Sequence, residues 1–197
     1  MSNKFQAPSP PASLEKVLEL PGVSLLTKSQ IKSYDDAREE EERLNKQIIK
    51  LSPSRTRNRR KEILAEISIG KVSLGDARKE LDELERAPEI YKALKEKSKI
   101  MDFETSLPLA IEILEKVLSH VRPAADLFID EERERYAEFG FEHLDSPLAL
   151  GIEEAVKRQE VALGGLSGRL RVSRGGRGAS LQVVSGLVEL VRLSGKS

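Results

Sequence analysis

Apolar residues recur at helical intervals over most of this sequence. The first seam lies between residues 27 and 51 and, with one polar exception at Glu41, consists of Tyr34, Ala37, Leu44, Ile48 and Leu51. The second begins after Ser73 and consists of Leu74, Ala77, Leu81 and Leu84, continued by Tyr91 and Leu94. Intervals of three and four residues place side chains on one face of a helix, so each seam predicts a long amphipathic helix. Two such helices in succession predict an antiparallel helical hairpin, in which Leu44 and Ile48 face Leu81 and Leu84.

Proline, glycine and capping residues mark the ends of these helices. Pro53 is predicted to end the first long helix, and a shorter helix is predicted over residues 61–69, before Gly70. Ser73, followed three residues later by Asp76, matches the pattern in which a serine side chain caps the start of a helix.

Three further helices are predicted between the hairpin and residue 163. The first opens at Ser106 and Pro108, and its apolar face comprises Leu109, Ile113, Val117 and Leu118. The second covers residues 123–139, and the third covers residues 147–163 and ends at a pair of glycines. We expect these helices to form a small cluster beside the hairpin.

The stretch from residue 180 to residue 193 is ambiguous by composition. Its valines favour a strand, but Gln182, Ser185, Glu189 and Arg192 follow one another at intervals of three, four and three residues. A polar stripe at that spacing predicts an amphipathic helix. Its apolar face is a candidate interface, formed by Leu181, Val184, Leu187, Val188 and Val191. The predicted fold class is therefore all-α.

Charge divides the chain although its 33 basic and 33 acidic residues balance. Residues 161–197 contain six bases and a single acid, Glu189, together with eight of the 13 glycines. We therefore predict a flexible proline-rich arm over residues 1–13, a helical body over residues 14–160, a basic glycine-rich linker over residues 161–179, and a terminal helix and tail over residues 180–197.

Two arginine clusters are candidate binding sites for phosphate groups. The first comprises Arg55, Arg57, Arg59, Arg60 and Lys61, and the second comprises Arg169, Arg171, Arg174 and Arg177. Such clusters bind phosphate by releasing counterions, whatever the base sequence of the nucleic acid. Solvation, or pairing with the acidic body of the chain itself, explains the same residues, and the sequence leaves these alternatives open.

The sequence contains no motif that is typical of a catalytic site or a metal site. The chain has no cysteine, and its two histidines, His120 and His143, have no metal-ligand spacing to a second histidine. The stretch over residues 67–73 resembles a phosphate loop but lacks its first glycine and the hydroxyl residue directly after Lys71. We therefore expect no catalytic site, no bound metal and no cofactor, and we predict that the protein is not an enzyme.

The predicted function is that of a helical interaction or assembly protein. We expect a protein partner or a homo-oligomer, with the basic C-terminal segment as an arm that docks on the same chain or on a neighbour. One alternative is an accessory nucleic-acid-binding protein that uses both arginine clusters. Another is peripheral membrane attachment through the terminal helix, which we favour less. The N-terminus does not resemble a signal peptide and no apolar run approaches about 18 residues, so we expect a cytoplasmic location.

Overall fold

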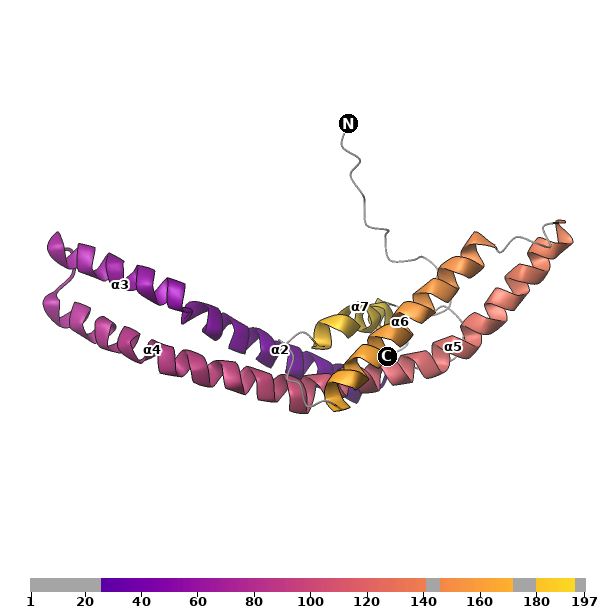
Figure 1. Cartoon of the computed structure of the whole chain (residues 1–197), viewed down its shortest axis with the longest axis horizontal. Coiled ribbons are helices and arrows are strands. Elements are labelled where there is room, and N and C mark those ends of the chain that lie inside the picture. The colour runs from indigo at the N-terminus through magenta and orange to yellow at the C-terminus, as the bar shows by residue number, and fades with distance from the viewer. Residues whose placement is uncertain (1–25, 141–145, 172–179, 194–197) are drawn as a thin grey trace, which may run out of the picture.

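The structure is a computed structural model that describes residues 26–140, 146–171 and 180–193. Every regular element within these ranges is helical, which confirms the all-α class. The predicted N-terminal arm and the first residues of the predicted helical body, 14–25, lie outside the described residues. The helices form an elongated molecule in which two antiparallel pairs extend in opposite directions from a shared centre (Figure 1).

The first pair is the predicted hairpin, and one of its two sides is divided. Helices α2 (Lys28–Lys50) and α3 (Pro53–Ser68) follow one another and form the first side. The single helix α4 (Leu74–Met101) forms the second side (Figure 1). The three helices pack in the predicted antiparallel manner, because Glu40 of α2 pairs with Lys97 and Arg59 of α3 pairs with Glu80. We refer to residues 38–100 as the long hairpin.

The predicted seam holds the long hairpin together, although it is only partly buried. Leu44 is buried, whereas Ile48, Leu81 and Leu84 are half-buried, because each helix meets a partner on one side only. Small residues and one isoleucine complete the close contacts, namely Ala77, Ala87 and Ile63.

The ends of the long hairpin follow the expected capping chemistry, with one correction. Thr27 and Gln30 form a reciprocal capping box at the start of α2, and the Ser73 side chain caps α4. The prediction that a helix begins only at residue 61 was wrong, because α3 begins at Pro53. A proline is tolerated in the first helical turn, where its missing N–H needs no partner. Gly70 has a φ of 69°, the left-handed conformation that commonly ends a helix with glycine.

The second side of the long hairpin continues without a break into the centre of the molecule. Helix α4 passes into a five-residue π-helix, η1 (Asp102–Ser106), and then into α5 (Leu107–Glu138). The predicted helix start at Ser106 and Pro108 agrees with the start of α5, although the chain enters α5 from η1 without a break, whereas the predicted helix start at Pro123 was wrong, since Pro123 lies inside α5. Pro108 falls at the first turn of α5, and Pro123 is flanked by Val121 and Ala125, which are buried in the core.

Two more helices complete the second pair and the centre. Helix α6 (Pro147–Arg171) packs antiparallel to α5, and α7 (Ser180–Leu193) lies against α5, α2 and η1. The predicted helix end at Gly164 was wrong, so residues 161–171 of the predicted linker are the last three turns of α6. The remaining linker residues, 172–179, lie outside the described residues. The predicted terminal helix is confirmed over residues 180–193.

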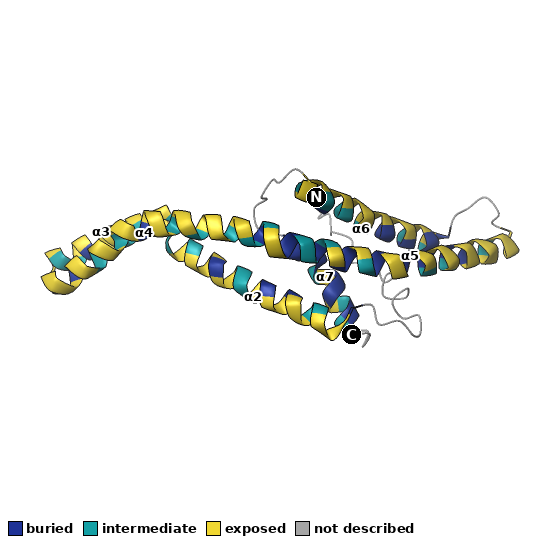
Figure 2. Ribbon diagram, turned by 90° about the horizontal axis from the view of Figure 1, so that it is seen from below, coloured by how far each residue is buried: buried dark blue, intermediate teal, exposed yellow. Residues whose placement is uncertain are grey.

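The main core lies where α5, α6, α7 and the start of α2 meet (Figure 2). Leu107, Ile113, Val117, Ile152 and Val188 are among its fully enclosed side chains. Among the described residues, none from 38 to 100 belongs to this core. The long hairpin therefore projects from the core, and most of its surface is exposed in Figure 2.

Candidate functional site

The apolar face of α7 is covered by the chain itself. All five residues predicted as an interface are buried, namely Leu181, Val184, Leu187, Val188 and Val191. They pack against α5, with additional contacts to α2 and η1. The surface that receives this helix therefore lies on the same chain, and these side chains are buried against it.

A buried carboxylate fixes the position of α7. Asp102 lies in η1 and is 1% exposed. One of its oxygens accepts a hydrogen bond from the Arg169 guanidinium at 2.7 Å, and the other accepts one from the Ser180 hydroxyl at 2.7 Å. Arg169 is at the end of α6 and Ser180 begins α7. Asp102 therefore holds the two ends of the connection between these helices against the middle of the long helical run.

A second carboxyl group, on α2, lies beside this junction. The pKa of Glu41 is raised, first by burial and further by the nearby Asp102 carboxylate, while Ser106 and Arg38 act in the opposite direction. Within the described part of the chain, the buried oxygens Oε1 of Glu41 and Oγ of Ser106 have no hydrogen-bond partner. We refer to Glu41, Asp102, Ser106, Arg169 and Ser180 as the polar junction, in which side chains from α2, η1, α6 and α7 meet.

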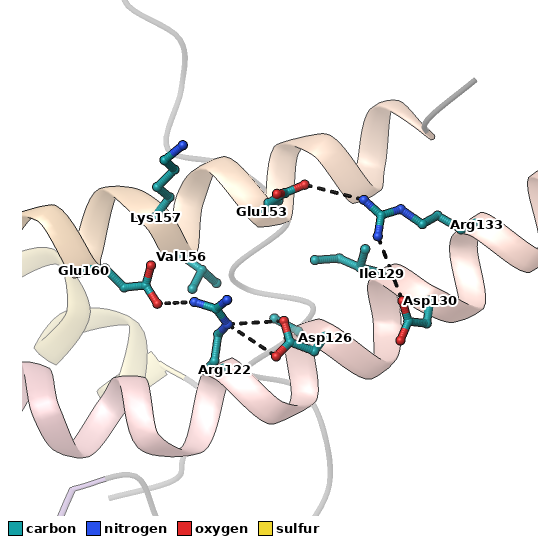
Figure 3. Close-up of a pocket in the computed structure, with 10 residues that line it drawn as sticks. Arg122, Asp126, Ile129, Asp130, Arg133, Glu153, Val156, Lys157 and Glu160 are labelled. Carbon is teal, nitrogen blue, oxygen red and sulfur yellow. Dashed lines mark hydrogen bonds and ion pairs between the residues drawn. The ribbon is translucent and has the colours of Figure 1, made fainter. Parts of the chain in front are cut away.

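Two surface hollows accompany these features. One, of about 260 Å³, lies between α2 and α7 and is lined by Tyr34, Arg38, Glu41, Glu42, Asn45, Leu181, Gln182 and Ser185. The other, of about 440 Å³, lies between α5 and α6 (Figure 3). In the second hollow, Arg122 bridges to Glu160 and Arg133 bridges to Glu153, above Ile129 and Val156. These two ion pairs join α5 to α6 across the hollow.

The first arginine cluster lies on α3, and one of its members is used within the long hairpin. Arg59 donates to both carboxylate oxygens of Glu80, at 2.6 and 3.1 Å, and also pairs with Glu62 and Glu66. The Arg59 guanidinium lowers the pKa of Glu80. The other four members, Arg55, Arg57, Arg60 and Lys61, are exposed and make no hydrogen bond or ion pair with any described residue.

The second arginine cluster does not form a surface of its own. Arg169 is engaged by buried Asp102, whereas Arg171 is exposed, and Arg174 and Arg177 lie outside the described residues. The two clusters are also far apart, since α3 lies at the outer end of the long hairpin and the end of α6 lies at the centre (Figure 1). A single nucleic-acid surface built from both clusters is therefore not present among the described residues.

The polar junction was not among the predicted site residues, apart from Arg169. Asp102 and Ser106 continue the core face of α5 backwards, because residues 102, 106, 110, 113 and 117 are three or four apart. This signal was hidden by the predicted helix start at Pro108, which placed the two residues outside a helix.

Metal ligands and membrane spans are absent from the part of the chain that the structure describes. No three His, Asp or Glu side chains there are placed to hold a metal ion. Of the described helices, none has both the length and the apolar character needed to cross a bilayer. His120 is exposed, and residues 142–145, which include His143, are outside the described ranges.

Comparison with known proteins gives no family for this chain: no family model, curated protein or solved structure matches it.

Proposed function

We propose that this protein is a non-enzymatic helical assembly protein that associates through its long hairpin. The observation that carries the proposal is that this hairpin projects from the core while exposing both apolar side chains and unpaired charges. Ordering such a long segment costs conformational entropy that its narrow seam offsets only in part. A partner that covers the exposed face would add the burial that the seam lacks.

The apolar part of this surface lies near the tip of the long hairpin. Leu64 on α3 is 53% exposed and Leu74 on α4 is 75% exposed. The Arg59–Glu80 pair and the buried Ile63 and Ala77 set the register, which places Leu64 and Leu74 at similar heights on the two sides of the hairpin. A contiguous exposed apolar patch can mark an association surface, and we propose that Leu64 and Leu74 contribute to one.

We assign association to the long hairpin and not to the terminal helix. The terminal helix would have to leave its groove on α5 before its apolar face could bind another copy or a membrane, because that face is buried. The exposed residues of the long hairpin require no such rearrangement.

Sedimentation velocity of the full chain over a range of concentrations tests this function. We expect species heavier than the 21.9 kDa monomer, whose population rises with concentration. Replacing Leu64→Ser and Leu74→Ser together removes apolar burial without changing charge, and should weaken association about 30-fold, equivalent to about 2 kcal/mol. Val161→Ser is the matched control, because Val161 is an equally exposed apolar residue on α6. A single monomeric species at every concentration would refute the proposal.

Nucleic-acid binding by α3 is the second candidate. It is favoured by the four exposed and unpaired bases of this helix, Arg55, Arg57, Arg60 and Lys61. Neutralising four phosphates predicts binding whose logarithm falls with the logarithm of salt concentration with a slope of about −3.6. The candidate does not require a specific base sequence.

Filter retention of DNA and RNA at low salt tests this second candidate. Arg55→Gln, Arg57→Gln and Arg60→Gln together should abolish retention. A matched control changes three exposed bases of α4, namely Arg78→Gln, Lys79→Gln and Arg86→Gln. Absence of retention by the parent protein, or equal loss in both triple variants, would exclude α3 as a specific phosphate-binding face.

A further inference from the structure

We infer that copies of this chain join head to tail, with the basic face of α3 in one copy bound to the acidic end of the α5–α6 pair in the next. The inference rests on the proposed assembly function and adds to it the identity and orientation of the partner. It follows from two oppositely charged surfaces that a single copy cannot bring together.

The basic surface is the first part of α3. Residues 53–64 contain five bases and one acid. Arg57, Arg60 and Leu64 are three or four residues apart and therefore share a helix face, on which all three are exposed. Arg57 and Arg60 have no acidic partner in the described structure, so their charge is free to act on another molecule.

The acidic surface is the far end of α5. Residues 126–138 contain six acids and two bases, and the adjacent α6 carries Glu153 and Glu154, which pair with Arg133 and Arg158. Leu127, Glu131, Glu134 and Glu138 follow one another at intervals of four, three and four residues, so they form one exposed stripe. None of these three glutamates pairs with a base within the described ranges.

The two surfaces lie at opposite ends of the elongated molecule. Figure 1 shows α3 at one end and the last turns of α5 at the other, with the core between them. Screening at physiological salt reduces attraction beyond about 8 Å, so the two surfaces cannot neutralise each other within one copy. A neighbouring copy presents each of them with its complement.

Each charged surface also carries exposed apolar side chains that a neighbour would cover. Leu64 and Leu74 lie at the basic end, while Leu127 is 68% exposed and Phe139 is 72% exposed at the acidic end. Opposite charges would align the two copies and the apolar side chains would add burial at the contact. Because the two contacting surfaces differ, a contact made once between two copies leaves one surface free on each copy, and repeating the contact produces rings or open chains of copies.

Charge reversal of the two surfaces tests the inference on the full chain. The first variant carries Arg57→Glu with Arg60→Glu, and the second carries Glu131→Arg with Glu134→Arg. All four residues are exposed and unpaired among the described residues, so both variants should keep the helix content and melting temperature of the parent. Each variant alone places like charges at the reversed positions of the contact, cancels the net charge of that surface, and should lose at least tenfold in association, measured by sedimentation at low salt. An equimolar mixture of the two variants should recover association, because each variant then meets its complement.

The outcomes separate the inference from the function on which it rests. Association of the parent that rises with concentration beyond dimer, falls with salt and is restored only in the mixture supports head-to-tail joining. A parent that associates equally well with either reversal, or a mixture that stays dissociated, overturns the head-to-tail contact but leaves the assembly function standing. A monomeric parent overturns both. Loss of nucleic-acid retention in the first variant without any change in association would also overturn the inference and would assign α3 to phosphate.

Discussion

Asp102 shows how one buried charge connects segments that are distant in sequence. Its partners Arg169 and Ser180 are 67 and 78 residues away along the chain. The cost of burying a carboxylate is high, and a charged pair offsets it only when geometry and further hydrogen bonds are favourable. Here both oxygens are satisfied, so the residue specifies where α6 ends and α7 begins.

Asp102→Ala should therefore destabilise the protein through the loss of both hydrogen bonds. Breaking a buried ion pair typically costs about 3–5 kcal/mol. Because the Arg169 side chain is 30% exposed, we expect Asp102→Ala to lower the free energy of unfolding by about 3 kcal/mol, near the lower limit. Chemical denaturation measures this change in the free energy of unfolding. Asp35→Ala is the control, since Asp35 pairs with Arg192 at the surface and should cost less than about 1 kcal/mol. Equal losses in both variants would contradict a structural role for the polar junction.

Glu41 predicts a pH dependence of opposite sign to that of an ordinary paired carboxylate. Its pKa is raised above 4.5 in the folded chain, so the native state binds the proton more tightly than the unfolded chain does. Stability that is present below pH 4.5 is then lost as pH rises through the raised pKa. Glu41→Gln carries no such charge, so its melting temperature relative to that of the parent should be higher at neutral pH than in acid. Glu42→Gln, at an exposed position, is the control, and its melting temperature relative to that of the parent should change little with pH. If the difference in melting temperature between Glu41→Gln and the parent did not depend on pH, the raised pKa of Glu41 would be contradicted.

At the level of elements, the hydrophobic spacing predicted which segments are helical but not where every helix ends. The spacing at Leu44 and at Leu81 correctly predicted two long helical segments, because a seam requires only local periodicity. Pro123 was wrongly taken as a helix start, whereas Pro108 does stand in the first turn of α5. A proline in a helix costs about 3 kcal/mol or more, and only tertiary packing such as that of Val121 and Ala125 shows that the cost is offset.

The glycines of α6 illustrate the same limit. Gly164, Gly165 and Gly168 each weaken a helix by about 1 kcal/mol relative to alanine, so the sequence alone favours an end there. Buried Leu166 and the Arg169–Asp102 pair hold these turns in place. The structure shows open space around all three glycines and gives no packing reason for their choice.

The terminal helix should detach as a unit when its packing is disrupted. Val188 is fully buried within the apolar core, so Val188→Asp would bury a charge in an apolar environment. We expect backbone amides of α7 to exchange hydrogen on the order of tenfold faster or more, while those of α5 and α6 remain protected. Val183→Asp on the exposed side of the same helix is the control. Uniform loss of protection along the chain would show that α7 is inseparable from the core.

The charge distribution of the whole molecule could not be predicted from the order of charges in the chain. The sequence suggests an acidic body and a basic tail, but Arg169 of that tail is taken up by Asp102. The folded chain instead separates α3 from the end of α5, although both belong to the predicted acidic body. The helical hairpin determines this separation, because it carries residues 53–64 away from the core before the chain returns.

The same geometry predicts that the long hairpin can be shortened without unfolding the core. No described residue from 38 to 100 belongs to the main core, and the Glu40–Lys97 pair places Asn45 of α2 opposite Lys92 of α4, within one helical turn of Leu94. Packed helices are about 8–10 Å apart, a gap that a four-residue glycine-serine linker can span. Replacing residues 46–93 by such a linker should leave a cooperative thermal transition and a helical circular dichroism spectrum, because Tyr34, Ala37 and the α5–α7 core keep all their contacts. The shortened chain should also sediment as a monomer at concentrations where the full chain associates, since it lacks both α3 and the apolar tip. Loss of cooperative unfolding would show that the long hairpin stabilises the core, and retained association would place the assembly surface elsewhere.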